Sequence, residues 1–155
     1  YQFEMVRLGI GLYGIGLGAQ GTEGLKPALT LRSFIQQIRT VQAGETVGYN
    51  RAGKINHPTR VGTVSVGYAD GLPRLAGNGR YALLVNGQEA PIIGDICMDM
   101  CMIDLSDIPE ASSGDEVVVF GAGHPIERLA QAGMTIPYEI LTDISPRVKR
   151  VYLKE

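Results

Sequence analysis

The chain has 155 residues, of which 45% are hydrophobic and 19% are charged, as is typical of a globular protein with a sizeable core. Its formal net charge of −2 and the absence of long like-charge runs argue against a nucleic-acid-binding surface or a basic membrane patch. No stretch approaches the roughly 20 consecutive apolar residues of a membrane-spanning helix.

Short apolar runs punctuated by glycine and proline predict a chain made mainly of β-strands. We expect strands within residues 4–15, 28–42, 59–70, 79–95, 96–107, 114–123 and 148–155. The run 28–42 is expected to form one long strand or two strands joined at a bulge. Within 79–95, the sequence "VNGQ" carries the Asn-Gly pair of a two-residue hairpin turn.

Two segments near the C-terminus, 125–133 and 136–144, have the pattern of short helices. In the first of them, Pro125 suits the opening turn and Gly133 suits the C-terminal stop. The spacing of the strands and their glycine-rich turns predicts an all-β fold with a short helical insertion. A compact barrel with Greek-key-like connections, or a sandwich, would satisfy this pattern.

Cys97 and Cys101 are the two cysteines of the chain. On a strand, positions four apart are separated by about 13 Å, which is too far for a disulfide. A metal site would need further ligands, and the two histidines are His57 and His124, so no metal is expected. We interpret both cysteines as small buried hydrophobic residues, which suits a reducing cytoplasm.

Two tyrosines stand in loop-like sequence. Tyr49 lies between glycine and asparagine in "AGETVGYNRAG" (43–53), where small and polar neighbours predict a ring held by the backbone, with its hydroxyl free. The structural alternative is a half-buried turn tyrosine. Tyr68, in "VGYADGLPR" (66–74), precedes an Asp-Gly turn and is expected to end a strand at the rim of the fold, as a site residue or as a strand-end aromatic.

The stretch "GDICMDMCM" (94–102) is read as part of a strand. Alternation would then place Asp99 on the face of the two cysteines, and Met98, Met100 and Met102 on the opposite face. Because an unpaired buried carboxylate is costly, Asp99 is expected to face solvent or a cleft, or to pair with an arginine. The methionines are interpreted as core residues.

Arg7 stands two residues before Gly9 in "MVRLGIGLYG" (5–14). A glycine backbone beside an arginine allows a phosphate or a ring nitrogen to approach closely, although Arg7 could equally lie on the exposed edge of a strand. No P-loop, HExxH, GxSxG or paired CxxC motif is present. The residues alone therefore predict a β domain with tyrosines at loop tips, and no particular reaction.

Read together, "MVRLGIGLYG", "AGETVGYN", "VGYADGLPR" and "GDICMDM" have the order and rough spacing found in alanine racemase, a pyridoxal phosphate enzyme. "LKPALTLRS" and "RVKRVY" also resemble that family. The resemblance implies that residues 1–20 end an N-terminal α/β barrel region and that residues 21–155 form the C-terminal β domain. It implies a homodimeric, cytoplasmic bacterial enzyme that interconverts L- and D-alanine for cell-wall synthesis. Because the chain starts at Tyr1 in mid-pattern, we expect a longer parent protein.

The same resemblance implies roles for residues at the substrate. Tyr49 would be one of two catalytic bases and would act in the active site of the partner subunit. Met98 would offer its backbone N–H to the substrate carboxylate, also across the dimer. Tyr68 and Asp99 would line the substrate entryway.

The implied contacts to pyridoxal phosphate come from the N-terminal motif. Arg7 would face the pyridine nitrogen, and Gly9 and Ile10 would give backbone N–H groups to the phosphate. The lysine that forms the Schiff base would belong to the N-terminal barrel, so the chain alone is expected to be inactive.

Two positions depart from the family pattern. Asp95 stands where many members have arginine, which changes the charge expected at the entryway. Pro146 stands where some members have a tyrosine that helps to hold the phosphate, and Tyr138 is not an obvious substitute.

Other functions fit parts of the pattern. A racemase of serine or of another small amino acid would share the motifs. A pyridoxal phosphate decarboxylase of basic amino acids also has a C-terminal β domain, but the four motifs do not resemble that family. A β module that binds a partner or a sugar without catalysis is the alternative outside the enzymes.

Overall fold

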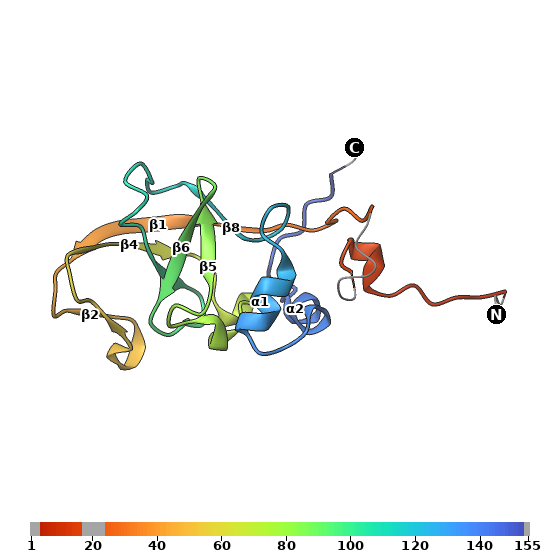
Figure 1. Ribbon diagram of the computed structural model, residues 1–155, viewed down its shortest axis with the longest axis horizontal. Coiled ribbons are helices and arrows are strands. Elements are labelled where there is room, and N and C mark those ends of the chain that lie inside the picture. Colours follow the sequence, from red (N-terminus) through yellow and green to blue (C-terminus); the bar gives the residue numbers. More distant parts are fainter. Residues whose placement is uncertain (1–3, 17–23, 154–155) are drawn as a thin grey trace.

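The computed structural model describes residues 4–16 and 24–153. Six antiparallel strands close a barrel in the order β1-β4-β7-β6-β5-β8. Their bounds are β1 Leu31–Val41, β4 Thr59–Val64, β5 Ala82–Val85, β6 Gln88–Ile93, β7 Cys101–Asp104 and β8 Glu116–Phe120. Strands β2 (Thr46–Val47) and β3 (Gly53–Lys54) pair separately and form an arm, residues 46–54, beside the barrel (Figure 1). The predicted all-β barrel is confirmed.

Strand β1 is the longest strand and joins two parts of the barrel. Its first half pairs with β8, and its second half pairs with β4. The register shifts between Ile35 and Gln37, where the strand changes partners. Of the two alternatives predicted for 28–42, one long strand is confirmed, and this strand itself contains a bulge. A bulge of this kind bends a strand, which helps a small sheet to close on itself.

The predicted hairpin joins β5 to β6. Val85 pairs with Gln88, so the connecting turn is Asn86-Gly87. Both turn residues have positive φ, 51° and 79°, as a two-residue turn that follows the twist of the strands requires. The Asn-Gly prediction is confirmed.

The two predicted helices are α1 (Ile126–Ala132) and α2 (Pro137–Asp143), and they pack on each other. Pro125 lies just before α1, and Gly133 just after it, as expected from the sequence. Both helices lie on the other side of the barrel from the β2–β3 arm (Figure 1). No helix of the described residues has the length and apolar character needed to cross a bilayer.

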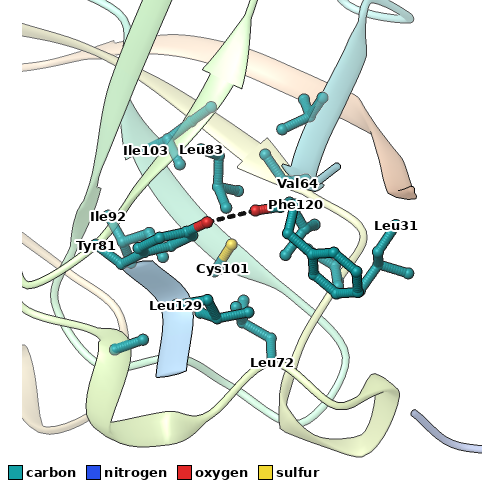
Figure 2. Packing of buried hydrophobic residues seen from close by; sticks show 14 of the residues in the cluster. Leu31, Val64, Leu72, Tyr81, Leu83, Ile92, Cys101, Ile103, Phe120 and Leu129 are labelled. Atoms are coloured by element: carbon teal, nitrogen blue, oxygen red, sulfur yellow. Dashed lines mark hydrogen bonds between the residues drawn. The ribbon is translucent and has the colours of Figure 1, made fainter. Parts of the chain in front are cut away.

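The barrel encloses one main hydrophobic core. Figure 2 shows Tyr81, Leu83, Cys101 and Ile103 converging inside it, and the Tyr81 hydroxyl donates a hydrogen bond of 2.6 Å to the carbonyl of Val119. A second, smaller cluster supports the arm and contains Val41, Val47, Ile55, Val61, Cys97 and Met102. The arm is thus anchored by apolar contacts of its own.

Two strand predictions are wrong, and a third is confirmed only in part. Residues 4–15 contain a 3₁₀ turn, η1 (Ile10–Tyr13), and no strand. In 96–107 only β7 is extended, because the Cys97 N–H bonds to the Met100 carbonyl at 2.9 Å and closes a turn before the strand. Residues 148–153 pair with no strand. Arg150 in that segment donates instead to the carbonyl of Ile144, just beyond α2.

Candidate functional site

Tyr49, Met98 and Asp99 line one open hollow with a volume of about 370 Å³. It lies between the arm and strands β1, β4 and β7. The other lining residues are Gln37, Arg39, Val47, Gly48, Val61, Thr63, Cys97, Met100 and Met102. The fold thus brings together three of the seven predicted site residues, although about fifty positions separate Tyr49 from the other two.

Tyr49 opens the 3₁₀ turn η2 (Tyr49–Arg51) at the tip of the arm. The residue is 69% exposed, so the alternative of a half-buried turn tyrosine is wrong. Gly48 before it has φ 75°, and a Cβ there would lie 2.9 Å from the methyl carbon of Met102. This glycine lets the chain turn sharply and present Tyr49 on the outside of the arm.

The base of the arm packs closely on the turn that leads to Met98. A Cβ on Gly94 would lie only 2.8 Å from the backbone nitrogen of Gly53. Next in this turn, the Asp95 carboxylate lies 3.0 Å from an Arg74 nitrogen and accepts a 2.8 Å hydrogen bond from the Asn78 amide. The pKa of Asp95 is lowered mainly by Asn78, and Arg74 adds to this effect.

The loops of Tyr68 and Met98 lie side by side. The N–H of Tyr68 donates to the carbonyl of Cys97, and the N–H of Ala69 donates to that of Met98, both at 3.0 Å. A Cβ on Gly67 would lie 2.3 Å from the Met98 carbonyl oxygen, so only glycine permits this approach. Within the described residues, the N–H of Met98 makes no backbone hydrogen bond and so can bind a ligand.

The sequence predicted that Tyr68 ends a strand, and this prediction is wrong. Strand β4 stops at Val64, and Tyr68 instead opens the 3₁₀ turn η3 (Tyr68–Asp70). The ring is partly exposed, and its backbone contact with Cys97 places it next to the hollow. Its neighbour Asp70 caps the turn by accepting a hydrogen bond from the N–H of Gly67 at 2.9 Å.

The side chains of 97–102 do not alternate as a strand. Asp99 is exposed, whereas both cysteines are buried, so the predicted shared face is wrong. Met98 and Met100 are exposed in the turn, and only Met102 belongs to the core. Asp99 forms a 2.8 Å ion pair with Arg147, and the sequence did not single out this arginine. Only the basic character of "RVKRVY" could have suggested such a partner.

The predicted cofactor residues lie elsewhere. Arg7 is exposed, Gly9 precedes η1, and Ile10 is buried in the main core. The η1 turn, drawn in red, lies at the opposite end of the molecule from the arm (Figure 1). A Cβ on Gly9 would lie 3.2 Å from the hydroxyl of Tyr138. A glycine backbone without a side chain, next to a hydroxyl, suits the binding of a phosphate. Tyr138 therefore lies closer to Gly9 than the sequence suggested.

The two cysteines are free and buried. Burial raises the pKa of the Cys101 thiol to about 12, so it stays protonated at neutral pH. Within residues 4–16 and 24–153, no group of three histidine, cysteine, aspartate or glutamate side chains is placed to hold a metal ion.

The family model described as "Alanine racemase, C-terminal domain" matches residues 28–152. The chain belongs to this family. It is 45% identical over 151 residues to an alanine racemase of Stutzerimonas stutzeri, with 96% of this chain and 42% of that protein covered. It is also 43% identical over 152 residues to a biosynthetic alanine racemase of Pseudomonas aeruginosa, covering 96% of this chain and 42% of the relative.

Crystal structures of alanine racemases share the fold. The biosynthetic enzyme from Pseudomonas aeruginosa superposes with a TM-score of 0.88 at 44% identity, covering 94% of this chain and 41% of that one. The enzyme from D-cycloserine-producing Streptomyces lavendulae superposes with a TM-score of 0.91 at 40% identity, covering 99% of this chain and 42% of that one. The chain therefore spans about two-fifths of the length of these alanine racemases.

Proposed function

We propose that the chain is the C-terminal part of an alanine racemase that interconverts L- and D-alanine with pyridoxal phosphate. Residues 1–20 would end the N-terminal barrel, and residues 21–155 would form the β domain; the boundary falls on residues outside the described ranges. The observation that carries the proposal is the exposed Tyr49 side chain, which lines the same hollow as Met98. A base and a free amide donor are what a reaction at the α-carbon of an amino acid requires.

Racemisation removes the α-proton from one face and returns a proton to the other, so it needs two bases on opposite faces. We assign one of them to the Tyr49 hydroxyl and the other to a lysine outside this chain. A tyrosine hydroxyl ordinarily keeps its proton at neutral pH, so groups outside the chain would have to favour loss of that proton before the oxygen can act as a base. The N–H of Met98 would meanwhile hold the substrate carboxylate.

Pyridoxal phosphate, when bound, withdraws electrons from the α-carbon of the amino acid and weakens its C–H bond. A bare backbone at Gly9 beside the hydroxyl of Tyr138 fits its phosphate, with N–H groups of Gly9 and Ile10 as donors. Arg7 is exposed and free to face the pyridine nitrogen. Its positive charge would disfavour protonation of that nitrogen. A structure from Bartonella henselae, 36% identical, is of an alanine racemase with covalently bound pyridoxal phosphate.

The positions of these two groups of residues support a dimer. The arm that carries Tyr49 lies at one end of the molecule, and the η1 turn that follows Gly9 lies at the other (Figure 1). One copy therefore cannot bring both groups to one small substrate. We propose that two copies build each site, with Tyr49 and Met98 from one and Arg7, Gly9 and Ile10 from the other. The two free cysteines suit a reducing compartment, and we propose the cytoplasm.

The test uses the full-length protein with added pyridoxal phosphate. Chiral separation of the products should show conversion of L-alanine to D-alanine, and the 155-residue chain alone should show none. Faster turnover of serine than of alanine would reassign the substrate and keep the chemistry. A full-length protein that racemises neither amino acid would contradict the proposal and favour a non-catalytic β module.

A further inference from the structure

Arg147, in the segment after α2, bridges two carboxylates from different loops. Its Nε lies 2.8 Å from Oδ1 of Asp70, and one of its terminal nitrogens lies 2.8 Å from Oδ1 of Asp99. Both partners raise the pKa of Arg147, Asp70 more than Asp99. A planar guanidinium can hold two carboxylates at once in a fixed geometry, whereas an ammonium is a single point of charge.

The two carboxylates belong to the loops that meet beside Met98. One oxygen of Asp70 binds Arg147, and the other accepts the 2.9 Å hydrogen bond from Gly67. Asp99 directly follows Met98 and lines the hollow. The bridge through Arg147 therefore ties together the two loops whose contact sets the position of the Met98 N–H.

The same bridge controls the local charge. Asp70 and Asp99 bring two negative charges next to a backbone amide that is proposed to bind a carboxylate. Like charges at this range would repel such a ligand. With Arg147 in place, the three side chains carry one negative charge between them instead of two. Asp99 lines the hollow and Asp70 does not, so the charge of Asp99 acts most directly on a ligand there.

We infer that Arg147 is a positioning residue that sets the affinity of the hollow for the carboxylate of an amino acid, by holding the Met98 loop and by neutralising Asp99. The inference rests on the function proposed above. It concerns binding of the carboxylate and leaves the proton transfer at Tyr49 untouched.

Propionate is a suitable probe because it has the carboxylate and the carbon chain of alanine but no amine. Its inhibition constant should be measured on the full-length enzyme for wild type, Arg147→Ala and Arg147→Lys, together with KM and kcat for L-alanine. We expect Arg147→Ala to raise the inhibition constant of propionate and the KM for L-alanine about five- to tenfold. The kcat should stay within about twofold of the wild-type value. The inhibition constant of Arg147→Lys should lie between those of wild type and Arg147→Ala, because lysine keeps the positive charge but lacks the planar guanidinium that holds two carboxylates.

Two further variants separate this role from general loosening of the segment. Arg150→Ala is the matched control, because Arg150 lies three residues away and, among residues 4–16 and 24–153, its side chain donates to backbone carbonyls alone. It should leave the propionate constant unchanged. The double variant Arg147→Ala with Asp99→Asn removes both charges of the exposed pair and should recover the part of the propionate affinity that neutralisation of Asp99 supplies, but not the part that comes from holding the loop.

Three results would overturn the inference: an unchanged propionate constant in Arg147→Ala, an equal rise in Arg150→Ala, or no recovery in the double variant. If Arg147→Ala does not fold, Arg147→Lys and the Arg150→Ala control decide by the same comparison. A wild-type enzyme that racemises no amino acid would instead contradict the proposed function, so the two failures are distinguishable.

Discussion

Asp95 forms a 3.0 Å ion pair with Arg74 and holds the turn on which the Tyr49 arm packs. The carboxylate also accepts a hydrogen bond from the Asn78 amide. The negative charge of Asp95 is thus balanced locally. This side chain serves here as an anchor between the barrel and the arm.

The Asp95 anchor predicts a pH-dependent loss of stability. The folded-state pKa of Asp95 is lowered, chiefly by Asn78, so its ionised form favours folding above the ordinary pKa of about 3.9. This contribution is lost as the pH falls through the lowered folded value. We expect Asp95→Asn to unfold at a lower temperature than wild type near neutral pH and the two melting curves to converge in acid. Asp107→Asn, at an exposed aspartate without an ion pair among the described residues, is the control.

The contact of the Tyr68 and Met98 loops predicts that Gly67→Ala is destabilising. Its Cβ would lie 2.3 Å from the Met98 carbonyl oxygen and 2.4 Å from that of Cys97, so the two loops must separate. We expect a loss of about 1–3 kcal/mol in the free energy of unfolding, measured by urea denaturation. Gly11→Ala, where the Cβ has no neighbour within 4 Å, should cost much less. Equal effects of the two substitutions would show that the loop contact is not tight.

His124 predicts a second pH dependence. Its Nε2 lies 2.9 Å from the carbonyl oxygen of Ala82 and donates to it, while Nδ1 has no partner among the described residues. Burial is the main cause that lowers the His124 pKa. The unfolded chain binds this proton at about pH 6.5, and the folded chain binds it only at lower pH. Stability should therefore fall as the pH drops below about 6.5, by at most about 1.4 kcal/mol per pH unit.

Denaturation at several pH values checks the role of His124. His124→Phe removes the titrating group, so the pH slope below neutrality should flatten even though the variant is less stable overall. His57→Gln, at the exposed histidine, should keep the wild-type slope. An unchanged slope in His124→Phe would assign the titration to other groups.

Burial of the two thiols predicts that both cysteines react slowly with thiol reagents in the folded protein. In the folded chain Cys101 is fully buried with its pKa raised to about 12, and Cys97 is nearly buried. A thiol reagent should therefore label neither cysteine quickly in the native protein and both after denaturation without a reductant. Labelling of no cysteine after denaturation would reveal a disulfide and contradict the structure.

Local patterns in the sequence predicted much of the fold. Alternation in β1, the Asn-Gly turn of the hairpin and the proline and glycine at the ends of α1 all depend on neighbouring residues, so the sequence shows them directly. The alternation in 96–100 was misleading because a hydrogen bond from Cys97 to Met100 outweighs it. The segment 148–153 has strand-like residues but finds no free strand edge in a closed barrel.

The candidate site was harder to predict, except through resemblance. Tyr49 could be singled out because small and polar neighbours surround it. The pairing of Arg147 with Asp70 and Asp99 joins residues that are nearly fifty to eighty positions apart, and such a contact exists only after the loops fold together. The closeness of Gly9 to Tyr138 has the same origin.

The role of Tyr49 as a base is tested most directly by α-proton exchange in D₂O with the full-length enzyme. L-alanine and D-alanine would be compared in wild type and in Tyr49→Phe, which keeps the ring and removes only the hydroxyl. If Tyr49 serves the L-enantiomer and a lysine outside this chain serves the D-enantiomer, Tyr49→Phe should lose exchange chiefly from L-alanine. Exchange of both enantiomers at wild-type rates would show that Tyr49 is not a base, and the account of this site would be wrong.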